Sequence, residues 1–198
     1  MTTLTSVISL DAQALLSNGI IKSMTVIDWG KAMARANEII QKDLLKYCGI
    51  QAYDPELDDD CPSISTKNNS PGFDIVVKTE SGELKRVQSK LRQVKGITDF
   101  SQQTHFETTR RHSKKNQGAN SNSGHVAYST DEFDYVMVTL INVRENLEKR
   151  NNVDDWSFSI IPIQALLNHE TGCCLTNIPS KILEQYRYTI NPASPPVF

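Results

Sequence analysis

Two short stretches decide the fold of this chain: PGFDIVV, residues 71–77, and RVQSK, residues 86–90. The first is rich in β-branched residues, as a buried strand should be, and the second alternates with the period of two that a strand shows. The residues between them include Glu80-Ser81-Gly82-Glu83, which has turn chemistry because Gly82 can adopt a positive φ. The sequence therefore predicts two strands joined by a tight turn.

This pair of strands places chemically useful side chains close together. Alternation puts Gln88 and Lys90 on one polar face of the second strand, and the turn brings Asp74 of the first strand close to both. A carboxylate, a second oxygen ligand and a lysine at one point form a site for a divalent metal that cuts a phosphodiester bond. We expect Asp74, Gln88 and Lys90 to be catalytic.

The same residues carry a resemblance to a known family. Pro71, Asp74, Gln88 and Lys90, each among hydrophobic residues, resemble the motif of the PD-(D/E)xK nuclease superfamily, which includes many type II restriction endonucleases. Here the proline stands three residues before the aspartate, and glutamine replaces the middle acid, as in Mrr-like nucleases and certain homing endonucleases. The resemblance covers about residues 71–92. It implies Mg²⁺ as cofactor, replaceable by Mn²⁺, held by Asp74, Gln88 and the backbone carbonyl of Ser89.

The remaining elements predict an α/β fold, a central mixed sheet flanked by helices. It agrees with the αββαβ core of restriction endonucleases. The expected helices and strands are a helix at 11–22, a helix at 29–48, a loop at 51–71, a polar helix with a basic end at 99–115, strands at 133–141 and 156–163, and short helices at 164–169 and 180–188. The tail, residues 191–198, holds three prolines and is expected to be extended, as an arm that could lie on a partner.

Composition bounds the class of protein. With 198 residues, 38% of them hydrophobic, the chain predicts a single nuclease domain over residues 1–198 with its core at about 29–163. It has no apolar run of about 18 residues, no secretion signal and no C-x-x-C spacing among its four cysteines. We therefore expect no contact with a membrane and a cytoplasmic location.

Two acidic features leave the metal ligands open. In the resembled family a glutamate on the first helix often joins the metal site, and Glu38 is the candidate here. A helical wheel places Glu38 opposite Trp29 and the apolar stripe, which favours a solvent-facing side chain. Five acids crowd residues 54–60, where we expect a solvated loop, although this loop leads directly to Asp74 and one of its acids could reach the metal.

Basic charge is concentrated near the second strand. Residues 85–115 hold nine basic and two acidic residues, a net charge of +7, whereas the rest of the chain carries −9. Such a patch is the electrostatic footprint of a protein that binds a phosphate backbone, and its polar side chains could also contact bases. The expected DNA contacts, within this segment and just after it, are Arg86, Arg92, Lys95, Arg110, Arg111, His112, Lys114, Lys115, Asn116, Gln117, Asn120, Asn122 and His125.

These features together predict a Mg²⁺-dependent, sequence-specific endonuclease of type II restriction type that acts on double-stranded DNA. A single small domain holds one cleft, so cutting both strands of a palindrome predicts a homodimer. Two alternatives stay open: a structure-selective or repair nuclease, such as a junction resolvase, and a DNA-binding protein of the same fold that does not cut. The glutamine at position 88 keeps the second alternative open.

Overall fold

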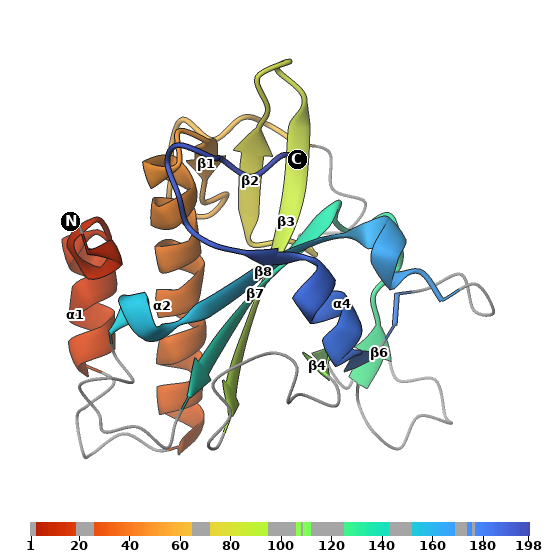
Figure 1. Cartoon of the computed structure of the whole chain (residues 1–198), viewed down its shortest axis with the longest axis horizontal. Helices are drawn as coiled ribbons and strands as arrows, with labels where there is room; N and C mark the ends of the chain where they lie inside the picture. Colours follow the sequence, from red (N-terminus) through yellow and green to blue (C-terminus); the bar gives the residue numbers. More distant parts are fainter. Residues whose placement is uncertain are drawn as a thin grey trace.

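A six-stranded mixed sheet forms the centre of the protein (Figure 1). The computed structural model describes residues 3–18, 26–64, 72–94, 106–107, 109–111, 125–142, 152–168, 174–175 and 177–198. In order across the sheet, the strands are β1 (Gln51–Tyr53), β2 (Ile75–Lys78), β3 (Leu84–Val94), β7 (Tyr135–Asn142), β8 (Ser157–Pro162) and β10 (Arg187–Tyr188). Only β3 and β7 run parallel, and the other neighbours are antiparallel.

Helices cover both faces of this sheet. Helix α1 (Leu10–Asn18) lies beside α2 (Val26–Tyr47), and α2 lies against β3 and β1 (Figure 1). Helix α4 (Ser180–Gln185) and the 3₁₀ turn η5 (Ile163–Leu166) contact β8. Alternation along the strands separates two cores: Val87 and Met137 pack with α1 and α2, whereas Val136 and Val138 pack with Leu166 and Leu183. The predicted α/β fold with a central mixed sheet is confirmed.

The predicted strand pair forms as an antiparallel hairpin. Ile75 is opposite Val87, and Lys78 is opposite Leu84. Gly82 has a φ of 84° and its N–H donates to the carbonyl of Thr79 at 2.9 Å, so the turn uses the conformation that glycine makes accessible. The strand β3 continues past β2 and is paired with β7 from Val87 to Val94. The start of β2 thus lies beside the middle of β3.

The predicted polar helix at 99–115 is wrong in the part of it that the structure describes. Residues 106–107 form β4, which pairs with β9 (Asn177–Ile178), and Thr109–Arg111 form β5, which pairs with β6 (His125–Ala127). The polar composition of this segment gave no helical stripe, and pairing with partners distant in sequence determines its structure. The helix of the expected αββαβ core is therefore absent from these described residues.

Smaller differences concern the ends of elements and the tail. Residues 163–166 form a 3₁₀ turn in place of the expected helix, and the last expected helix ends at Gln185, after which β10 joins the sheet edge. The tail folds back on its own chain: the Phe198 ring lies 5.1 Å from that of Tyr135, centroid to centroid, at an angle of 76°. This contact joins the end of the tail to β7, and the expected role of the tail as an arm on a partner stays a prediction. Within the described ranges, no helix is long and apolar enough to span a membrane.

Candidate metal centre at the start of β2

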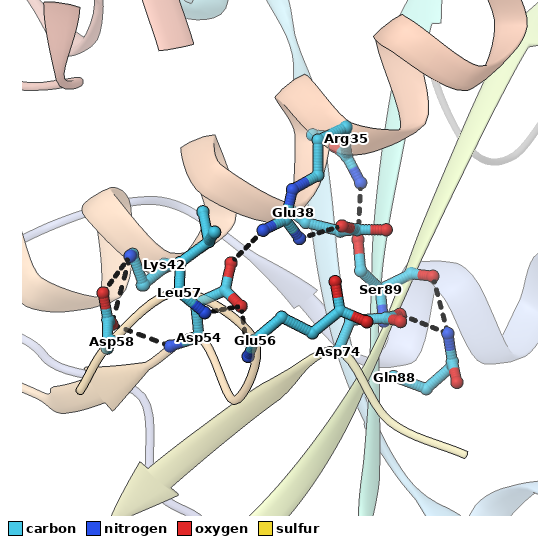
Figure 2. A network of polar contacts seen from close by, with 11 residues as sticks. Arg35, Glu38, Lys42, Asp54, Glu56, Leu57, Asp58, Asp74, Gln88 and Ser89 are labelled. Carbon is cyan, nitrogen blue, oxygen red and sulfur yellow. Dashed lines mark hydrogen bonds and ion pairs between the residues drawn. The ribbon is translucent and has the colours of Figure 1, made fainter. Parts of the chain in front are cut away.

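Asp74 is held at the point where β2 begins. Its N–H donates to the carbonyl of Val87 at 3.0 Å, which aligns it with β3. Its Oδ2 atom accepts a hydrogen bond of 2.8 Å from the Ser89 N–H and a second one from Nε2 of Gln88 (Figure 2). The hairpin therefore brings Asp74, Gln88 and Ser89 together, as the sequence predicts.

Gln88 reaches the site through its amide nitrogen. Nε2 donates to Asp74 Oδ2 and also to the Ser89 carbonyl at 3.2 Å, while the amide oxygen points away from both (Figure 2). Two acceptors face this end of the amide, so chemistry requires a donor there. Because the oxygen is the atom that could bind a metal, Gln88 is not placed as a ligand in this conformation. The expected role of Gln88 as a metal ligand would require the amide to turn.

Lys90 lies on the same face of β3 as Gln88, two residues further along. Its ammonium Nζ donates to the hydroxyl of Tyr128 at 2.9 Å and lies 4.9 Å from the centroid of that ring. It is also close enough for its positive charge to lower the pKa of Asp74. The positive charge of Lys90 thus acts on the Asp74 carboxylate, and Tyr128 is a neighbour of Lys90 that the sequence motif did not identify.

Helix α2 brings Glu38 to the same site. Arg35, Glu38, Asp54, Glu56 and Asp74 line one pocket of about 210 Å³, together with Pro55 and Phe73. The Glu38 side chain is only 22% exposed, so the preference for a solvent-facing Glu38 is wrong. The helix has a second packed side, because α1 covers one flank while β3 and β1 contact another.

An arginine joins two acids at this pocket. Arg35 donates from Nη1 to Glu38 Oε2 and from Nη2 to Asp54 Oδ2, at 2.6 Å in both cases (Figure 2). Asp54 is 2% exposed and also accepts the N–H groups of Glu56 and Leu57. The expectation of a solvated loop is therefore wrong for Asp54, whereas Asp59 and Asp60 are exposed as expected. Backbone donors within the loop and a helix arginine offset the cost of burying Asp54.

The acids of the pocket affect one another. Burial and, after it, the negative charge of Glu38 raise the pKa of Asp74 to about 7, against the opposing effects of the Ser89 N–H, Lys90 and Arg35. Burial likewise raises the pKa of Glu38, although Arg35 opposes the shift. Carboxylates that are desolvated beside one another favour a cation between them. The pocket is thus electrostatically suited to bind a positive ion.

The donor set fits a hard cation with a partial protein shell. Asp74, the Ser89 carbonyl and Glu38 offer oxygen atoms, and Mg²⁺ retains several waters while binding one or two carboxylates. Within the described residues, no group of three or more His, Cys, Asp or Glu side chains could hold a metal ion. Mg²⁺ needs fewer protein ligands than a metal held in a full protein cage.

Arg86 has a structural partner. Its guanidinium donates to Asp134 from Nε at 3.1 Å and from Nη2 at 2.9 Å, and Nη1 donates to the Asp131 carbonyl. The Arg86 N–H also donates to Asp134 Oδ2 at 2.7 Å. Its donors join β3 to the residue that precedes β7, and the expected contact of Arg86 with DNA stays a prediction.

The other expected DNA contacts are only partly placed. Arg92 is half-buried on β3, on the same face as Lys90. The backbone puts Arg110 and Arg111 on β5, with Arg111 opposite His125 of β6. The remaining expected contacts lie outside the described residues: Lys95, His112, Lys114, Lys115, Asn116, Gln117, Asn120 and Asn122. Pro71 of the motif lies outside them as well.

No protein-family model, no curated protein and no solved structure matches this chain. Arg35 was missed as a site residue because it comes from a helix far from the hairpin in sequence. The sequence left open that an acid of residues 54–60 reaches the site, and Asp54 and Glu56 line the pocket. The signal for the two acids was the crowding of carboxylates at 54–60 just before Asp74.

Proposed function

We propose that the protein is a Mg²⁺-dependent endonuclease of type II restriction type that hydrolyses phosphodiester bonds in double-stranded DNA. The observation that carries this proposal is the meeting of Asp74, the Ser89 carbonyl and Lys90 on one hairpin, with Glu38 of α2 lining the same pocket as Asp74. Two carboxylates and a carbonyl supply oxygen ligands on one side, and a lysine supplies a positive charge beside them. This combination suits the hydrolysis of a negatively charged ester.

The metal would be held by Asp74, the Ser89 carbonyl and Glu38. When bound, Mg²⁺, or Mn²⁺ in its place, supplies Lewis acidity and lowers the pKa of a water molecule. Lys90 would orient that water and stabilise the charge that develops on the phosphate oxygens. Arg35 holds Glu38 within the pocket until a cation competes for it.

The DNA would approach the site along the C-terminal half of β3. Arg92 follows Lys90 on the same face of that strand, and the segment after it holds the rest of the basic cluster. These charges would contact phosphates, with an affinity that falls as salt rises. Double-strand cleavage of a palindrome by a domain with one such pocket implies a homodimer, in which two sites are related by a dyad.

One observation favours a second candidate, a DNA-binding protein that does not cut. The Gln88 amide already donates to the Asp74 carboxylate and to the Ser89 carbonyl, the oxygens that a metal would share. A neutral donor in that place satisfies both acceptors without any cation. The two candidates therefore differ in whether the amide can turn and admit Mg²⁺.

A digestion experiment tests the proposal. The purified protein is incubated with plasmid of known sequence in Mg²⁺, in Mn²⁺ and in EDTA, and the ends are mapped by sequencing. Our proposal predicts ends at one repeated sequence and no product in EDTA. Binding of duplex without product in either metal would support the non-cleaving candidate. Cleavage of four-way junctions in preference to duplex would indicate a structure-selective nuclease.

A further inference from the structure

The ammonium group of Lys90 has a fixed neighbour. A lysine side chain has a flexible four-carbon stem, so the position of its charge is defined only where a rigid partner holds it. Here Nζ donates to the Tyr128 hydroxyl at 2.9 Å and also lies 4.9 Å from the ring centroid, within the range of a cation–π contact. The tyrosine thus contacts the lysine both through its oxygen and through its ring.

Tyr128 itself is rigidly placed. It is 5% exposed within the core that covers the Val136 face of the sheet. The rings of Tyr128 and Phe133 pack edge to face, with their centroids 5.2 Å apart and an angle of 76° between the ring planes. The Tyr128 carbonyl accepts the N–H of Cys174 at 2.9 Å. Moving this ring would disturb packed aromatic contacts and a backbone hydrogen bond, so its hydroxyl is a fixed point.

We propose that Tyr128 is the positioning residue for Lys90: its hydroxyl fixes the ammonium on the face of β3 that also carries Gln88, where the reacting phosphate would lie. This role rests on the nuclease function proposed above. Tyr128 directly follows β6, whose partner β5 carries Arg110 and Arg111, so one short segment would connect a DNA-contacting strand pair to the reacting centre. In this proposal the phenol is neither a metal ligand nor a substrate contact, and it acts through Lys90.

The substitution Tyr128→Phe isolates this role because it keeps the ring and removes only the hydroxyl. Loss of a hydrogen bond to a charged group is expected to lower kcat by roughly tenfold, with KM for DNA and the Mg²⁺ midpoint unchanged. Tyr188→Phe is the matched control. Tyr188 lies on β10 at one edge of the sheet, and its hydroxyl also donates a hydrogen bond, of 3.0 Å to the Ser194 carbonyl. Both variants should lower Tm modestly, because each loses one hydrogen bond, but Tyr188→Phe should keep the kcat of the wild type.

A chemical readout tests the inference without any cleavage. Acylation of Lys90 by an N-hydroxysuccinimide ester, followed by peptide mass spectrometry, measures how firmly the ammonium is held. The hydrogen bond must be broken before the amine can attack, so Tyr128→Phe should speed acylation of Lys90 by about fivefold and leave Lys85 unchanged. Faster acylation in a protein that cuts no DNA would support the contact while rejecting the nuclease function. If the wild type cuts DNA and Tyr128→Phe has the same kcat, or if Lys90 is acylated at the same rate in both proteins, the role of Tyr128 is overturned and the nuclease function is not.

Discussion

At the scale of single residues, Gln88 determines how the centre behaves without metal. The amide gives two hydrogen bonds to the oxygens of Asp74 and Ser89, in the place where a glutamate of the more common motif would meet a cation. A carboxylate at this position would instead face two acceptors with no donor. In the proposed metal centre, glutamine in place of glutamate would therefore lower the affinity for metal and stabilise the metal-free protein.

Gln88→Glu should make that trade visible. Without metal, repulsion from Asp74 and the Ser89 carbonyl should lower the free energy of unfolding by about 1–3 kcal/mol. With Mg²⁺ the added charge should tighten binding, so Tm should rise more steeply with Mg²⁺ than in the wild type, and activity should survive at lower Mg²⁺.

Gln88→Leu is the control for this prediction, since it removes the hydrogen bonds without adding charge. It should show no stronger Tm response to Mg²⁺ than the wild type and should lose activity at every concentration if a turned Gln88 serves as a ligand. Normal cleavage by Gln88→Leu would show that Gln88 is not a metal ligand. An identical Mg²⁺ response of Gln88→Glu and wild type would place the metal elsewhere.

At the scale of elements, two contacts add to the β3–β7 strand pairing in holding the hairpin against β7. The first is the ion pair of Arg86 on β3 with Asp134 at the start of β7. The second is the close approach of Gly72 to the turn before β7, where a Cβ on Gly72 would lie 2.9 Å from Cβ of Glu132. Both contacts lie next to residues of the proposed centre, so they set its geometry as well as its stability.

The Arg86–Asp134 pair should give a defined pH dependence. Burial raises the pKa of Asp134, but hydrogen bonds from Arg86 outweigh it, so the pKa in the folded protein lies below its usual value. The stabilisation is therefore complete above the unfolded-state pKa of about 4 and is lost as pH falls through the lower folded value.

Asp134→Asn should reduce the free energy of unfolding by about 1 kcal/mol at neutral pH, because a bidentate pair becomes a neutral contact. Urea unfolding of wild type and variant at about pH 7 and about pH 3 measures the difference, which should narrow in acid. A difference that is the same at both pH values would exclude this ion pair as its source.

Gly72→Ala should destabilise the protein by about 1–3 kcal/mol through overpacking. Relief by moving Glu132 is limited, because its Oε1 accepts the Ser129 N–H at 3.0 Å. Thermal unfolding measures the loss, and adding Glu132→Gly should recover part of it by removing the opposing Cβ. A single variant as stable as the wild type would mean that the loop before Asp74 adapts freely.

Elements with a strong local pattern were predictable from the sequence, and short ones were not. The β2–β3 hairpin follows from β-branched residues, alternation and Gly82, and α2 follows from its apolar stripe. The strands β4, β5 and β10 contain two or three residues each, too few for a period, and they exist because distant partners pair with them. Residues 106–111 were assigned to a helix for this reason.

At the scale of the whole molecule, only part of the candidate site could be predicted from the sequence. Asp74, Gln88 and Lys90 lie on two strands joined by one turn, so local rules bring them together. The positions of Glu38 and Arg35 depend on which side of α2 meets the sheet. The prediction for Glu38 gave most weight to the apolar stripe, whereas α2 packs on more than one side. The orientation of the Gln88 amide depends on acceptors that only the folded chain assembles.

The central claim is that Asp74 and Lys90 cut DNA with Mg²⁺, and plasmid cleavage tests it most directly. Supercoiled plasmid is incubated with wild type, Asp74→Ala, Lys90→Ala and, as control, Asp43→Ala, which removes a carboxylate on α2 that accepts the Ser9 N–H. All four should fold and bind DNA, measured by circular dichroism and a gel-shift assay. We predict Mg²⁺-dependent nicks or linear product for wild type and Asp43→Ala, and none for Asp74→Ala or Lys90→Ala. Cleavage by Asp74→Ala at the wild-type rate, or intact plasmid with the wild type in Mg²⁺, would contradict the account.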